Sequence, residues 1–111
     1  MKTITVTQKQ DIPAGQMKGF TVEGKQLLIA NVGGTFYAVD AVCTHMKGYL
    51  PAGTLQAHIV TCPVHHAQYD VTSGKVHKNI NLLFRLSTGH GAADLKSYDM
   101  AVDGDDVKVT I

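Results

Sequence analysis

The segments Cys43-Thr44-His45 and Cys62-Pro63-Val64-His65 are separated by sixteen residues and contain both cysteines of the chain. Each segment supplies one thiol and one imidazole, and both groups bind transition metals in proteins. If the fold brings the two segments together, they provide four ligands for one metal centre. The pattern therefore predicts a metal site built from two loops.

This donor set is compatible with two kinds of metal site. Two cysteines and two histidines can hold a closed structural zinc ion. They can also hold a [2Fe-2S] cluster in which a histidine pair replaces a cysteine pair on one iron. Cys-x-His is an unusual half of a zinc finger, but the donor set alone leaves both sites open. A disulfide is less favoured, because paired Cys/His spacing without a secretion signal indicates metal binding.

Length and composition indicate one globular domain over residues 1–111, and 44% of the residues are apolar. The net charge is +1, without the basic stripe that would indicate a nucleic-acid partner. No continuous apolar run follows the N-terminal residues 1–6, so neither a signal peptide nor a membrane span is predicted. We therefore expect a cytoplasmic protein with no membrane partner.

Short segments that alternate between apolar and polar residues are separated by turn residues along most of the chain. Gly33-Gly34 and Asp103-Gly104-Asp105 are strong hairpin signals. The pattern is typical of an antiparallel sandwich or barrel. Residues 79–94 are the least readable part: periodicity does not decide whether residues 82–86 form a strand or a helical turn, and residues 87–93 are predicted to be a polar, glycine-rich loop. Strands are predicted at residues 2–8, 17–22, 26–31, 35–39, 57–61, 95–102 and 106–111.

The paired motif resembles that of the Rieske [2Fe-2S] proteins, and the resemblance covers nearly the whole chain. Residues 36–40 resemble the strand that leads into the family's first cluster loop, and Leu50 and Gly53 match an apolar residue and a glycine of that loop. Residues 62–75 resemble the second loop and the turn after it. Residues 95–98 and the terminal hairpin resemble the last two strands.

The resemblance implies an all-β fold, an antiparallel β-sandwich with a small cluster-binding subdomain formed by loops at about residues 40–53 and 62–75. It implies that Cys43 and Cys62 bind one iron of the cluster and that His45 and His65 bind the other. With neutral imidazoles the oxidised site carries no net charge, which makes an added electron less costly than in a cluster with four thiolates.

Two features of the loops predict a reduction potential in the lower part of the Rieske range. High-potential members have an extra cysteine in each loop, joined as a disulfide, whereas no cysteine remains here to form one. They also have a serine that donates to a bridging sulfide, and the matching residue here is Ala67. Tyr69 retains a hydroxyl that can donate to a cysteine sulfur, and fewer donors to sulfur lower the potential.

The chain departs from the family pattern at two places. His66 occupies a position that is usually glycine, so we expect a positive φ there; the alternative is that His66 is a fifth metal-active or proton-active group beside the four ligands. Residues 79–94 are longer than the family's connection and lack its proline. Leu50 is a candidate for shielding the cluster, and a lysine rim for docking a partner is an alternative to an ordinary solvated face. The rim would consist of Lys47, Lys75 and Lys78.

The resemblance implies a soluble one-electron carrier, a Rieske-type ferredoxin, with no catalytic residues of its own. Such a protein passes electrons from a flavin-dependent reductase to a terminal oxygenase or another redox enzyme. One alternative is a small Rieske subunit of a larger oxidoreductase of the nitrite reductase type. The other is a structural zinc module.

Overall fold

The computed structural model describes residues 2–44, 48–64, 66–78 and 92–111. These residues form ten short strands and two 3-10 helices, η1 (Lys9–Asp11) and η2 (Leu50–Ala52). No helix in the described part of the chain has the length and apolar character needed to cross a bilayer. The strands are β1 (Thr3–Gln8), β2 (Met17–Val22), β3 (Lys25–Val32), β4 (Thr35–Asp40), β5 (Thr54–Gln56), β6 (Ile59–Thr61), β7 (Gln68–Asp70), β8 (Val76–Lys78), β9 (Ser97–Asp103) and β10 (Asp106–Thr110).

The larger sheet is antiparallel and has the strand order β1-β10-β9-β4-β3-β2. Its hairpins are made by residues that reach the left-handed backbone region. Glu23 and Gly24 have φ values of 51° and 79°, and Gly33 and Gly34 have 61° and 96°. Two consecutive positive φ angles are the requirement of the two-residue turn that matches strand twist. The hairpin predicted at Gly33-Gly34 is thus confirmed.

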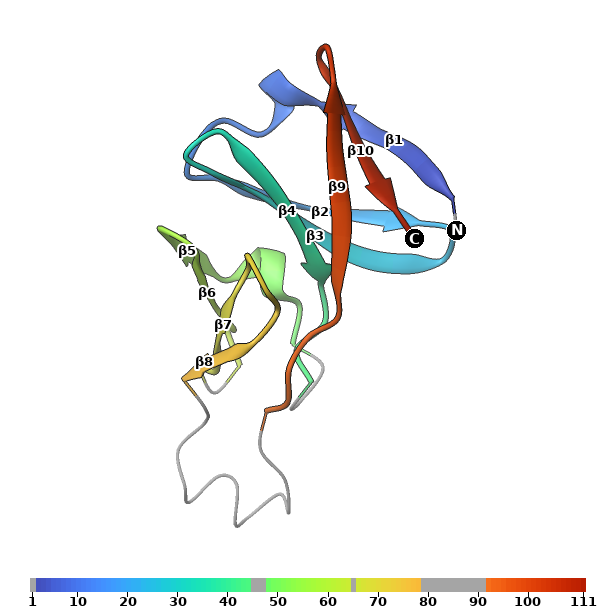
Figure 1. Ribbon diagram of the computed structural model, residues 1–111. Helices are drawn as coiled ribbons and strands as arrows, with labels where there is room; N and C mark the ends of the chain where they lie inside the picture. The colour runs from blue at the N-terminus through green and yellow to red at the C-terminus, as the bar shows by residue number, and fades with distance from the viewer. Residues whose placement is uncertain (1, 45–47, 65, 79–91) are drawn as a thin grey trace.

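The smaller sheet, β5-β6-β7-β8, lies beside one end of the larger sheet (Figure 1). The chain enters it after β4 and leaves it toward β9, so the small sheet is an insertion between two paired strands of the large one. Residues 41–53 connect β4 to β5, and residues 62–67 connect β6 to β7. Both predicted ligand segments therefore belong to the smaller sheet's connections.

Two apolar clusters form the core, and β3 contributes to both. Leu27 and Ile29 pack with buried residues of β4 and β10 inside the larger sheet. Leu28 and Ala30 pack on the other side with residues of the smaller sheet and with both cysteines. All four side chains are completely buried. Because successive strand residues point to opposite faces, one continuous apolar run supplies both cores.

The predicted all-β antiparallel fold is confirmed, and so are the strands near residues 2–8, 17–22, 26–31, 35–39, 95–102 and 106–111. The strand predicted at 57–61 is partly wrong, because only Ile59–Thr61 is extended. Ala57 has φ 53° and forms the turn between β5 and β6 with His58. The sequence did not indicate β5 or β8. Of the ambiguous segment 79–94, residues 79–91 lie outside the described residues.

The two glycines Gly74 and Gly104 provide a matched test of how tightly the smaller sheet is joined to the larger one. Both have positive φ, 83° and 62°, but a Cβ on Gly74 would collide with the Leu95 carbonyl, whereas Gly104 faces open space. We expect Gly104→Ala to lower the free energy of unfolding by about 1 kcal/mol through backbone strain alone. Gly74→Ala should cost about 1–3 kcal/mol more through overpacking.

Urea unfolding of the two variants measures this difference. Both substitutions lower the conformational entropy of the unfolded chain by the same amount, so the comparison isolates the contact with Leu95. Equal losses of stability in the two variants would contradict the tight junction.

Candidate metal centre

Each cysteine begins a short loop that closes on itself by the same hydrogen bond. The Cys43 N–H donates to the Gly48 carbonyl, and the Cys62 N–H donates to the Ala67 carbonyl, both at 2.8 Å. In both loops the acceptor lies five residues after the cysteine. The first loop is further held by the bond from Leu50 N–H to the Ala41 carbonyl, also at 2.8 Å. Both cysteines are therefore held by their own backbone at the base of a tight loop.

The two loops meet at the sulfur of Cys62. A Cβ on Gly48 would lie 2.6 Å from Cys62 Sγ and 3.1 Å from a methyl group of Val64. A side chain at this position would thus displace the thiol or the second loop. Glycine at position 48 allows the first loop to approach the second closely enough to share one site.

Both thiols are buried and free. Cys43 is 1% exposed, Cys62 is fully buried, and neither forms a disulfide. The pKa of the Cys62 thiol is raised to about 11, mainly by burial; the nearby Cys43 also raises it, whereas the Val64 N–H lowers it. That N–H donates to Cys62 Sγ at 3.4 Å. In an apolar environment, two neighbouring thiols both favour their neutral forms over the thiolates. A bound metal ion would instead favour the thiolates.

Tyr69, in β7, reaches the other sulfur from inside the core. Its hydroxyl lies 3.1 Å from Cys43 Sγ, and its side chain is completely buried. Burial and then the contact with Cys43 raise the pKa of Tyr69. The phenol therefore keeps its proton and can donate a hydrogen bond to a thiolate. The sequence-based expectation that Tyr69 donates to a cysteine sulfur fits this geometry.

Each sulfur thus has a hydrogen-bond donor within reach, which fits metal-bound thiolates better than an apolar thiol pair. His45 and His65, the predicted imidazole ligands, lie outside the described residues, as does Lys47. In the part of the chain that is described, no group of three or more metal-binding side chains occurs. The structure therefore brings together the cysteine half of the predicted site, together with Tyr69.

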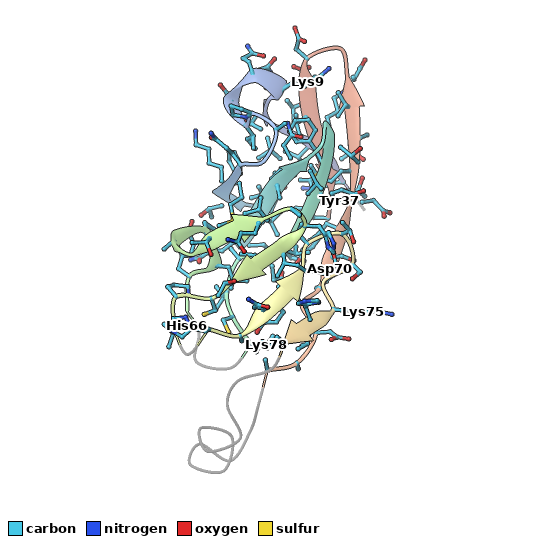
Figure 2. The ribbon with its side chains drawn as sticks, turned by 90° about the vertical axis from the view of Figure 1, so that its left-hand side faces the viewer. Lys9, Tyr37, His66, Asp70, Lys75 and Lys78 are labelled. Carbon is cyan, nitrogen blue, oxygen red and sulfur yellow. The ribbon has the colours of Figure 1, made fainter. Side chains whose placement is uncertain are left out.

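The other predicted residues around the site have distinct positions. Leu50 is fully buried in the apolar cluster that includes both cysteines. His66 is exposed and has φ 63°, as expected for a residue in a usual glycine position. Figure 2 shows His66 and Lys78 at the same end of the molecule, far from Lys9 in η1. Lys75 is also exposed.

Sequence reasoning missed two residues of this centre. Gly48 was only a loop glycine in the sequence, and its approach to Cys62 depends on how the loops pack. Thr44 was only a spacer between two ligands. Its hydroxyl oxygen lies 3.1 Å from the Tyr69 hydroxyl and also contacts the backbone of Ala93, 49 residues away. A contact between residues so far apart in the chain produces no recognisable pattern in the local sequence.

The family model for the Rieske [2Fe-2S] domain matches residues 2–83. The chain belongs to this family. Its cofactor is therefore a [2Fe-2S] cluster of the Rieske type, and not the structural zinc that the donor set had left open. The buried, donor-lined cysteine pair fits this assignment.

Proteins similar to this chain include ferredoxin components of dioxygenase systems. The chain is 30% identical over 110 residues to a "naphthalene 1,2-dioxygenase system, ferredoxin component" from Pseudomonas aeruginosa, covering 99% of this chain and 96% of that protein. The protein of the same description from Pseudomonas putida is 39% identical over 75 residues, covering 68% and 72% of the two chains.

A solved structure of a complex of reduced oxygenase and oxidised ferredoxin in carbazole 1,9a-dioxygenase contains a chain that superposes on this one. The TM-score is 0.81 at 25% identity, and the match covers 97% of this chain and 92% of that chain. The similarity to solved Rieske structures confirms the antiparallel fold with its small cluster-binding sheet.

The raised pKa of Cys62 predicts how the metal-free protein responds to alkaline pH. An unfolded thiol loses its proton near pH 8.5, whereas the folded Cys62 keeps it to about pH 11. Between these values the folded state binds more protons, so the free energy of unfolding falls as the pH rises. We expect Cys62 to account for a loss of about 2 kcal/mol between pH 8 and pH 10.5.

Urea unfolding of the metal-free wild type and of Cys62→Ala at both pH values measures this contribution. The two proteins differ only at position 62, so the difference between the two pH responses reports the contribution of Cys62. The same loss of stability in both proteins would show that burial does not hold the proton on this thiol.

Proposed function

We propose that this protein is a one-electron carrier, a Rieske-type ferredoxin, and not an enzyme with its own substrate. The observation that carries the proposal is the buried pair of cysteine sulfurs, held by two tight loops and supplied with hydrogen-bond donors. The relatives described as ferredoxin components support the same role. The bound cluster supplies a reversible one-electron couple.

We assign Cys43 and Cys62 as the ligands of one iron and His45 and His65 as the ligands of the other. The convergence of the two loops at Cys62 supports the cysteine assignment. The histidine assignment rests on the spacing within each motif. His66 is one residue too far for that spacing, and its left-handed backbone explains why the family usually has glycine at this position.

The residues of this chain contribute mainly by controlling charge at the sulfurs. The Tyr69 hydroxyl and the Val64 N–H favour negative charge on Cys43 and Cys62, respectively, and donors to sulfur raise a cluster's potential. Leu50 and Ala67 are fully buried beside the cysteines and exclude water from this side. The cysteine side of the cluster is therefore shielded from solvent and from partners. We expect electrons to enter and leave at the histidine side of the cluster.

The partners we assign are a flavin-dependent reductase as donor and a terminal oxygenase or another redox enzyme as acceptor. We treat residues 1–111 as one Rieske domain and place it in the cytoplasm, where cysteines remain reduced. Electron-transfer partners generally meet through small, weak interfaces. The exposed Lys75 precedes β8 and the exposed Lys78 ends it, so both would contact an acidic partner surface at this sheet.

The same substitution at two adjacent histidines tests the cluster assignment. His65→Gly should abolish the Rieske-type EPR signal and lower the iron content, because one ligand is lost. His66→Gly should retain two irons per chain. It should also be as stable as the wild type or about 1 kcal/mol more stable, because glycine adopts φ 63° without strain.

Iron and acid-labile sulfide analysis, EPR after reduction and urea unfolding give these results. Loss of the cluster in His66→Gly with retention in His65→Gly would transfer the ligand role to His66. A colourless wild-type protein that holds one zinc would overturn the proposed function.

The reduction potential should lie in the lower part of the range of roughly −150 to +300 mV that Rieske clusters span. The reason is that Ala67 offers no hydroxyl near the cluster. Ala67→Ser should raise the midpoint, by about 40 mV for each kcal/mol by which the new bond favours the reduced state. Ala67→Gly adds no donor and serves as the control.

A spectroscopic redox titration measures the midpoint and should follow a one-electron Nernst curve of about 59 mV per decade. A wild-type midpoint well above zero would contradict the low-potential prediction. A two-electron slope would contradict the assignment as a one-electron carrier.

A further inference from the structure

Thr44 joins three parts of the chain that meet beside Cys43. Its hydroxyl donates to the Ala93 carbonyl at 2.8 Å, and the Ala93 N–H donates back to the same oxygen at 2.8 Å. The hydroxyl oxygen also lies 3.1 Å from the Tyr69 hydroxyl. Ala93 lies in the segment that leads to β9, so one side chain connects the first ligand loop, β7 and that segment.

The hydrogen atoms in this group can be assigned from its donors and acceptors. The Ala93 carbonyl can only accept, so it takes the single hydroxyl hydrogen of Thr44. The backbone N–H of Thr44 donates to the Tyr69 oxygen at 3.3 Å. The one hydrogen of Tyr69 then has two possible acceptors at 3.1 Å, the Thr44 oxygen and Cys43 Sγ.

Charge decides between these two acceptors when the site is loaded. A metal-bound cysteine is a thiolate, and a hydrogen bond to a charged acceptor is about twice as strong as one to a neutral oxygen. The Tyr69 hydrogen therefore points to Cys43 Sγ. Its phenol oxygen stays in place because the Thr44 N–H is bonded to it, and that N–H is itself fixed by the double hydrogen bond between Thr44 and Ala93.

We propose that Thr44 is a positioning residue that tunes the reduction potential through Tyr69. Its two bonds to Ala93 fix the Thr44 backbone, the Thr44 N–H holds the phenol oxygen, and the phenol donates to Cys43 Sγ. This inference rests on the proposed function, since it requires a loaded redox centre. It extends the proposed function, because it predicts that the segment before β9 affects the charge on the ligand Cys43.

A rival role for Thr44 is purely as a cover over the sulfur. Thr44 is exposed, so breaking its bonds to Ala93 would also let water approach Cys43. Water would affect the potential whether or not Tyr69 has a hydroxyl. Positioning through Tyr69 affects the potential only when that hydroxyl is present, so a double-mutant cycle separates the two roles.

The experiment measures midpoint potentials of four cluster-loaded proteins: the wild type, Thr44→Val, Tyr69→Phe and the double variant. Valine has nearly the shape of threonine and retains the backbone N–H but forms neither side-chain bond to Ala93. We expect Thr44→Val to lower the midpoint in the presence of Tyr69 and to leave it unchanged in the Tyr69→Phe background. Thr44→Ser keeps the hydroxyl and should restore the wild-type midpoint.

Equal shifts from Thr44→Val in both backgrounds, or no shift in either, would overturn the proposal. If valine prevents loading, Thr44→Ala makes the same deletion with a smaller side chain. Failure of both to load while Tyr69→Phe loads normally would also overturn it, because Thr44 would then act on the site independently of Tyr69. A wild-type protein without a [2Fe-2S] EPR signal would instead refute the proposed function, so the two failures are distinguishable.

Discussion

Complete burial of four central residues of β3, on both faces of the strand, is the constraint on which the rest of this structure depends. Leu27 and Ile29 close the core of the larger sheet, while Leu28 and Ala30 close the core that contains the cysteines. Without these β3 residues, each apolar core would be open on one side. The redox site is therefore not an independent module beside a scaffold, since the same four residues support both.

The site itself is built by backbone closure and controlled by a few polar atoms. The cysteines are placed by N–H bonds to carbonyls five residues later, and Gly48 allows the loops to touch. Only the Val64 N–H and the Tyr69 hydroxyl then donate to sulfur among the contacts described for these residues. Donors to sulfur raise the potential, so whatever holds these two donors in place also affects it.

The sequence predicted the parts of the protein that depend on local pattern. Most of the longer strands show alternation, β3 shows a continuous apolar run, and the hairpins at Gly33-Gly34 and Asp103-Gly104 contain the residues their backbone requires. Three-residue strands such as β5 and β8 are too short to establish alternation. The turn at Ala57 was missed because alanine seldom adopts φ 53°, so nothing in the local sequence marks it.

The same distinction applies to the metal centre. Motif spacing predicted that Cys43 and Cys62 share a site, and the resemblance to a known family predicted the contact from Tyr69. The contribution of Thr44 depends on Ala93, which reaches it only through the completed fold. Long-range hydrogen bonds of this kind leave no periodic trace in a sequence.

The position of the cysteines on either side of the β5–β6 hairpin makes the cluster an optical reporter of local unfolding. The hairpin separates the two ligand loops along the chain, and the pairing of β5 with β6 brings the ends of these loops together. Opening of the small sheet would bleach the visible colour even while the larger sheet remained folded. Comparing bleaching with the loss of β-sheet circular dichroism would therefore measure how independently the two sheets unfold.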